Sequence, residues 1–137
     1  MWLVSDTMFV IVQVLMTLLN WRYGMYGATP SPWLNCACSI AYCMFMFFYA
    51  YFNSKSRIGL NIGVLQLAGA VIALVISVTQ ADAVLLGLLG TLLLVPFIGL
   101  AAIAKGTACI MLMLAICLAL LVIRLYARRK ANFRSGG

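Results

Sequence analysis

The sequence predicts an all-α protein that crosses a lipid bilayer about five times, with four crossings as the alternative. Of its 137 residues, 66% are hydrophobic and 8% are charged, whereas soluble domains average about 45–50% apolar and about 25% charged residues. A soluble chain of this length has too little interior to hide so much apolar surface. Because one helical crossing takes about 20 apolar residues, we expect a single transmembrane helical bundle over residues 1–126 and a basic tail over 127–137.

Five hydrophobic segments are separated by short polar or turn-rich breaks. They cover residues 2–20, 33–53, 59–79, 83–104 and 108–126. The fourth contains Pro96, and proline removes a backbone donor and kinks a helix. We favour a kinked membrane-spanning helix at Pro96 over a re-entrant hairpin, which would leave four crossings.

Lysine and arginine predict the orientation in the membrane, because cytoplasmic loops carry an excess of both. We therefore place the basic tail in the cytoplasm, on the inner (cytoplasmic) membrane of a cell. With five crossings the N-terminus lies outside, and six of the nine basic residues lie inside and three outside. If the fourth segment does not cross, Lys55 and Arg57 move to the inner side. The tail residues expected to contact anionic lipid head groups are Arg128, Arg129, Lys130 and Arg134.

The third segment carries the clearest pattern, a face of small and polar residues spaced four, three, four, three and four apart. Its members are Gly59, Gly63, Gln66, Ala70, Ala73 and Ser77. This spacing puts all of them on one side of a helix, and small residues let helix backbones approach closely in membranes. The face predicts helix packing, either within the monomer or between copies of the chain, or the lining of an aqueous path.

Other polar residues are scattered through the hydrophobic segments. They include Gln13, Asn20, Asn35, Asn61 and Gln66. Because such groups are costly in a membrane unless paired, we expect hydrogen bonds between helices in preference to a hydrophilic pathway.

Sulfur-containing residues crowd the second and fifth segments. They are Cys36, Cys38, Cys43, Met44 and Met46 in the second, and Cys109, Met111, Met113 and Cys117 in the fifth. Thiolates and thioethers select soft metals such as Cu(I), so a site would require the two segments to touch. We favour ordinary apolar packing and predict no metal site and no cofactor.

Composition argues against catalysis. The chain has no histidine, and its two acids, Asp6 and Asp82, lie at the ends of different segments. The usual general bases are therefore missing or far apart, and we predict that the protein is not an enzyme. The tail has one aromatic residue, Phe133, so it offers little for stacking on bases, and we expect no nucleic-acid partner.

Two stretches resemble the three-span holins of phages. The first is Arg22, Gly27-Ala28, Pro32 and Ala41-Tyr42; the second is Ala83-Val84-Leu85-Leu86 followed by Lys105-Gly106-Thr107-Ala108. The resemblance implies an inner-membrane protein that associates laterally and opens lesions in the membrane, with no catalytic residues. Two alternatives stay open: a non-catalytic accessory subunit of a larger membrane complex or a phage exclusion factor, and a small transporter or channel.

Overall fold

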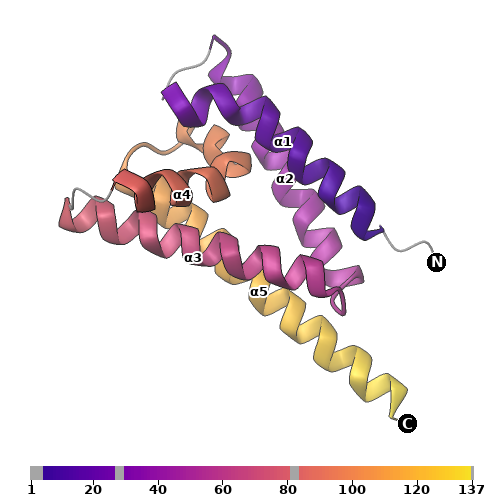
Figure 1. The fold of residues 1–137 in the computed structure, drawn as a ribbon. Helices are drawn as coiled ribbons and strands as arrows, with labels where there is room; N and C mark the ends of the chain where they lie inside the picture. The colour runs from indigo at the N-terminus through magenta and orange to yellow at the C-terminus, as the bar shows by residue number, and fades with distance from the viewer. Residues whose placement is uncertain (1–4, 27–29, 81–83, 137) are drawn as a thin grey trace.

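A computed structural model describes residues 5–26, 30–80 and 84–136 of the chain, and within these ranges it is helical without strands. The elements are α1 (Asp6–Tyr26), α2 (Pro32–Phe52), α3 (Arg57–Thr79), α4 (Val84–Leu94), the 3-10 helix η1 (Val95–Ala102) and α5 (Thr107–Ser135), shown in Figure 1. The predicted all-α class is confirmed. Gly27-Ala28 and Ala83, which carry part of the holin resemblance, and Asp82 lie outside the described residues.

Three of the helices, α2, α3 and α5, are long and apolar enough to cross a membrane. Shorter apolar helical stretches, 6–21 and 88–102, lie in α1 and in α4 with η1. This pattern is consistent with a membrane protein of the kind that the composition predicts.

Local chemistry explains several helix ends. Pro32 opens α2, where its fixed φ suits a first turn and its missing N–H is not needed. Ser56 caps α3, since its hydroxyl oxygen accepts a hydrogen bond from the Gly59 amide at 3.1 Å. Gln80 ends α3 in the left-handed conformation, with φ 51°.

The fourth hydrophobic segment differs from the expected kinked crossing helix. Its α-helix ends at Leu94, and a 3-10 helix with Pro96 near its start continues to Ala102. The physical reason is that proline breaks the α-helical hydrogen-bond ladder, while the tighter 3-10 turn accommodates it. Pro96 therefore marks a change of helix type.

The segment also begins and ends at the same end of the molecule. The Ser77 hydroxyl, near the end of α3, lies 3.0 Å from the Thr107 hydroxyl, at the start of α5. Figure 1 shows the end of α3 and the start of α5 on the same side of the molecule. Between these points η1 packs against α1 and α2, so the segment enters the bundle and returns, as in the re-entrant alternative.

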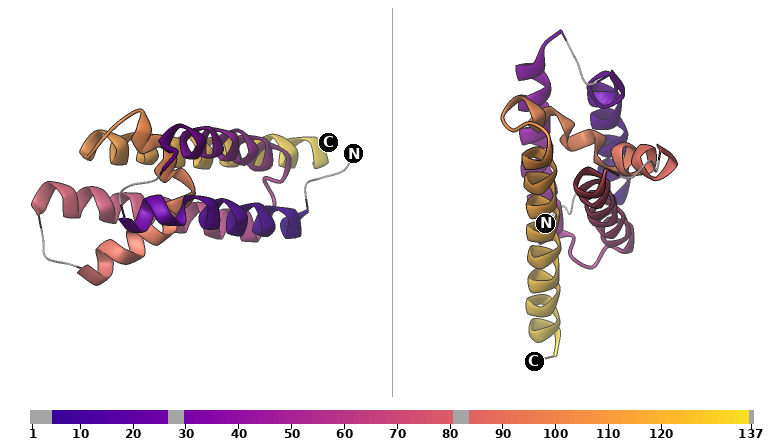
Figure 2. Two further views of the ribbon diagram at one scale, coloured as in Figure 1. Left: turned by 90° about the horizontal axis from the view of Figure 1, so that it is seen from above. Right: turned by 90° about the vertical axis from the view of Figure 1, so that its left-hand side faces the viewer.

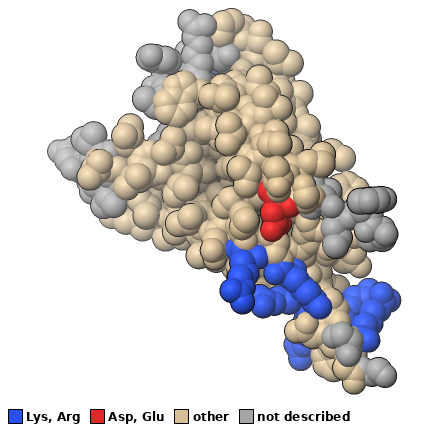
Figure 3. Space-filling model, turned by 45° about the vertical axis from the view of Figure 1, so that its right-hand side comes forward, with Lys and Arg blue, Asp and Glu red and all other residues tan. Residues whose placement is uncertain are grey.

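The opposite end gathers the start of α1, the α2–α3 turn and the C-terminal half of α5. Hydrogen bonds join Asp6 to Ser56, and Arg124 to the Asn53 carbonyl. The tail continues α5 as a helix through Ser135 and projects beyond the bundle in Figures 1 and 2. On the face shown in Figure 3, basic side chains gather at this end beside an acidic one.

Two glycines test the packing directly. A Cβ at Gly99 would lie 2.0 Å from the Asn35 carbonyl oxygen, whereas a Cβ at Gly63 meets nothing within 4 Å. Gly99→Ala is therefore expected to cost the upper end of the roughly 1–3 kcal/mol typical of overpacking, or more, because the clashing atom is backbone. Gly63→Ala, the matched control, is expected to be neutral or slightly stabilising. Unfolding of the two variants in detergent measures both effects, and equal stabilities would contradict the close contact of η1 with α2.

Candidate functional site

Polar side chains line the inner sides of α1 and α2 along their length, and Ser56 and Gln66, before and within α3, join them. On α1, Asp6, Gln13 and Asn20 recur every seven residues, and on α2, Asn35, Tyr42 and Tyr49 do the same. A seven-residue step returns close to the same face of a helix. We call the whole set the polar seam: Asp6, Gln13, Asn20, Asn35, Ser39, Tyr42, Tyr49, Ser56 and Gln66.

One end of the polar seam holds η1 in place. The Ser39 hydroxyl, which is fully buried, donates to the Pro96 carbonyl oxygen at 2.8 Å and accepts from the Gly99 amide at 3.1 Å. The Asn20 amide donates to the Pro96 carbonyl at 3.2 Å, and the Asn35 amide donates to the Asn20 side-chain oxygen at 2.9 Å. Side chains of α1 and α2 thus satisfy backbone groups that the short 3-10 helix leaves open.

The middle of the polar seam links three helices. Tyr42 of α2 is fully buried, donates to the side-chain oxygen of Gln13 on α1, and accepts from the Gln66 amide of α3 at 2.9 Å. Phe97 of η1 packs edge-on against the Tyr42 ring, with centroids 5.1 Å apart. Since Tyr42 is the central residue of α2, η1 reaches about halfway along the bundle.

The other end of the polar seam is charged. One carboxylate oxygen of Asp6 accepts from the Tyr49 hydroxyl at 2.6 Å and from the Ser56 hydroxyl at 2.8 Å. The guanidinium of Arg124 lies 5.2 Å from the Tyr49 ring centroid, in a cation–π arrangement, and donates to the Asn53 carbonyl at 3.1 Å. A cation is favourable there, because the carbonyl end of α2 carries partial negative charge.

The small-residue face predicted on the third segment lies against helices of the same chain. A Cβ at Gly59 would lie 2.5 Å from Tyr49 and 2.7 Å from Arg124, so this glycine makes room for both side chains. Gln66 bonds Tyr42, and Ser77 lies beside Thr107. Ala70 is fully buried and belongs to the hydrophobic core. Ala73 is partly buried and packs against that core. The contacts are those of the intramolecular alternative.

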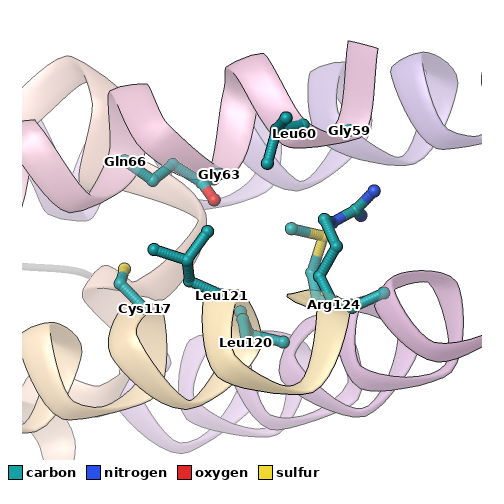
Figure 4. A pocket seen from close by; sticks show the side chains of 10 residues that line it. Gly59, Leu60, Gly63, Gln66, Cys117, Leu120, Leu121 and Arg124 are labelled. Carbon is teal, nitrogen blue, oxygen red and sulfur yellow. The ribbon is translucent and has the colours of Figure 1, made fainter. Parts of the chain in front are cut away.

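Gly63 lies apart from these contacts and lines a small void between α3 and α5. Figure 4 shows the void with Gln66 and Gly63 on one side and Cys117, Leu121 and Arg124 on the other. It leaves about 10 Å³ for the centres of water-sized spheres, which is close to the minimum that one water molecule needs. The Gln66 side-chain oxygen is buried and has no hydrogen-bond partner within the described part of the chain. A single water is the occupant that the space admits.

Sequence reasoning found part of this arrangement. Of the five residues expected to form interhelical hydrogen bonds, Gln13, Asn20, Asn35 and Gln66 do so. The fifth, Asn61, has an exposed side chain. The tyrosines and Ser39 were missed, although the seven-residue spacing of Asn35, Tyr42 and Tyr49 was a signal for them. Arg124, near the end of the fifth predicted segment, was counted only among the basic residues of the inner side, yet its side chain is buried, at 4% exposed.

The other predicted tail contacts lie farther along α5. Arg128, Arg129, Lys130 and Arg134 have exposed side chains, all beyond Arg124. Their role as lipid anchors stays a prediction.

Comparisons with protein-family models, with curated proteins and with solved structures found no match to this chain. The resemblance to holins therefore rests on the short motifs described above.

Ser39 provides a direct test of how η1 is held. Ser39→Ala removes the acceptor of the Gly99 amide, and a buried unpaired amide costs about 1–3 kcal/mol. We expect faster hydrogen exchange of the η1 amides, measured by mass spectrometry in detergent, with little change in α3. Thr79→Ala, which removes an exposed hydroxyl bonded only to its own helix, is the control. Unchanged exchange in η1 of the Ser39 variant would show that other contacts hold the segment.

Proposed function

We propose that the chain is a protein of the cytoplasmic membrane that crosses the bilayer four times, through α1, α2, α3 and α5, with both termini in the cytoplasm. The support is geometric: α4 and η1 begin and end near the same end of the bundle, at Ser77 and Thr107. α1 and α2 have 21 residues each. At about 1.5 Å per residue, each helix is long enough to cross the hydrocarbon core of a bilayer, which is about 30 Å thick.

The charge distribution supports this topology better than five crossings. Lys55 and Arg57, in the α2–α3 turn and at the start of α3, join the five basic residues from Arg124 onward on the cytoplasmic side. Seven of the nine basic residues then lie inside, and only Arg22 and Lys105 lie outside. With five crossings, six basic residues lie inside and three outside, and the N-terminus lies outside.

A split fluorescent protein tests the topology. A short complementing tag at the N-terminus, or after Gly137, should meet its cytoplasmic partner fragment and fluoresce in living cells. The same tag inserted between Ala104 and Lys105 should stay dark, because that loop lies outside. A dark N-terminal tag on a protein whose C-terminal tag fluoresces would restore five crossings.

The polar seam carries the proposal for what the protein does: permeabilising the membrane, in a holin-like manner, by self-association. Interhelical hydrogen bonds in membranes contribute only about 0.6 kcal/mol on average, so stability alone gives little reason for nine polar side chains along one interior. Polar residues inside a membrane bundle also line paths for water or ions. The polar seam is closed in this conformation, because Tyr42 is hydrogen-bonded to both Gln13 and Gln66.

Opening would follow from displacement of η1. Asn20 and Ser39 would then lose their partners on η1 and turn toward water. Copies of the chain would meet through the outward faces of α3 and α5. Only 17% of the most apolar stretch of α3 and 28% of that of α5 are buried within the chain. The small residues of α3, apart from Gly63, already contact other helices of the same chain, so they do not carry this association.

The proposal predicts a timed loss of membrane potential during expression in bacteria, followed with a potential-sensitive dye. Gln13→Leu combined with Tyr42→Phe should delay or abolish the loss at equal protein level, because the opened path would lack two of its polar groups. Leu15→Ile, on the exposed side of α1, is the control. Growth with intact potential at high levels of the unaltered protein would refute permeabilisation.

A small channel or transporter is the second candidate. It is favoured by η1, which reaches only about halfway along the bundle and lies beside the buried polar seam. Non-helical backbone at membrane depth is tolerated where protein buries it or where it lines a cavity. The size of the leak separates the two candidates. A holin-like lesion releases dextran from vesicles that contain the purified protein, whereas a channel passes ions and retains dextran.

A further inference from the structure

A hollow opens at the charged end of the bundle, away from the void beside Gln66. It has a volume of about 400 Å³ and lies where the start of α1, the α2–α3 turn and Ala131 of α5 meet. Pockets for small molecules span roughly 300–1,000 Å³, so this space suits a ligand of modest size. Its lining includes Asp6, Phe52, Ser54 and Lys55, and we call it the end hollow.

Two opposite charges line the end hollow without pairing. Asp6 and Lys55 both line it, yet they form no ion pair with each other, which would bring a nitrogen within 4.0 Å of a carboxylate oxygen. The hydrogen bonds that the Asp6 carboxylate accepts from Tyr49 and Ser56 both fall on its Oδ1 atom. The second carboxylate oxygen can therefore accept from a ligand.

A buried hydroxyl adds a third polar group to this lining. Ser54 is 6% exposed and lines the end hollow. Its hydroxyl has no hydrogen-bond partner among the residues that the structure describes. Because a buried hydroxyl without a partner is unfavourable, a ligand with an acceptor atom would satisfy it. The end hollow thus offers an anionic acceptor at Asp6 and two donors, at Ser54 and Lys55.

We propose that the end hollow binds the headgroup of an aminophospholipid, with its ammonium on the Asp6 carboxylate and its phosphate on Lys55 and Ser54. A headgroup that carries both charges matches the two unpaired charges of the lining. Hydrogen bonds between charged groups are the strong ones. An anionic headgroup without an amine, such as that of phosphatidylglycerol, would place negative charge near Asp6 without a donor for it.

The position of the end hollow favours a lipid over a dissolved compound. Asp6 begins α1 and Phe52 ends α2, so in a chain whose α1 and α2 cross the bilayer this hollow lies at the level of the headgroups. The Phe52 side chain is 43% exposed, and aromatic rings at helix ends prefer that level. The inference rests on the membrane location proposed above and does not require permeabilisation.

The test is native mass spectrometry of the purified protein in detergent, titrated with phosphatidylethanolamine or with phosphatidylglycerol of identical acyl chains. We expect phosphatidylethanolamine to bind about tenfold more tightly or better, the ratio that one hydrogen bond to a charged group supplies. Asp6→Asn should abolish this preference. It keeps an oxygen that can accept from Tyr49 and Ser56, so it removes the charge with little change in shape. Lys55→Gln should weaken the binding of both lipids.

Lys105→Gln is the matched control, because Lys105 is an exposed lysine just before α5, at the opposite end of the bundle. It should leave both affinities unchanged. Water-soluble glycerophosphoethanolamine should fail to displace the lipid, and displacement at equal concentration would show that the ligand is a dissolved compound. Equal affinity of the unaltered protein for the two lipids would refute the proposal. An undiminished preference in Asp6→Asn, shown to be folded by circular dichroism, would do the same.

Discussion

The pair of hydrogen bonds between the Ser39 hydroxyl and the backbone of η1 is the contact on which the rest of the arrangement depends. A 3-10 helix inside an apolar bundle has backbone groups that lipid cannot satisfy. Ser39 accepts from the Gly99 amide and donates to the Pro96 carbonyl, and the absence of a side chain at Gly99 brings the two backbones together. Without the Ser39 hydroxyl the buried Gly99 amide would lose its side-chain acceptor.

A second contact, made by Arg124, holds α5 at the opposite end of the bundle. Because η1 turns back, α5 starts beside the end of α3 and runs to the end where α1 begins. That path brings Arg124 against Tyr49 and the carbonyl end of α2, in the space left by Gly59. The proposed topology, the gathering of basic residues at one end and the contact between α2 and α5 all follow from where α5 starts.

Much of the fold could be predicted from sequence, because hydrophobic length and turn residues are local properties. The segments, the break at Pro96 and the α3 face at Gly59, Gln66 and Ser77 were found in this way. The return of the fourth segment was not, since it depends on Ser39 meeting Gly99 across 60 positions of the chain. The burial of Arg124 was missed for a similar reason: its partners are α2 and the α2–α3 turn, far away in sequence.

The distance between the two ends of the fourth segment tests most directly whether this segment returns to the side where it began. Gln80→Cys and Lys105→Cys, in a background with the five native cysteines replaced, would carry spin labels for pulsed electron resonance in lipid nanodiscs. We predict a separation well below the roughly 30 Å of a bilayer core, since Ser77 and Thr107 lie side by side. A separation of about 30 Å or more would mean that the segment crosses, and would contradict the re-entrant fold.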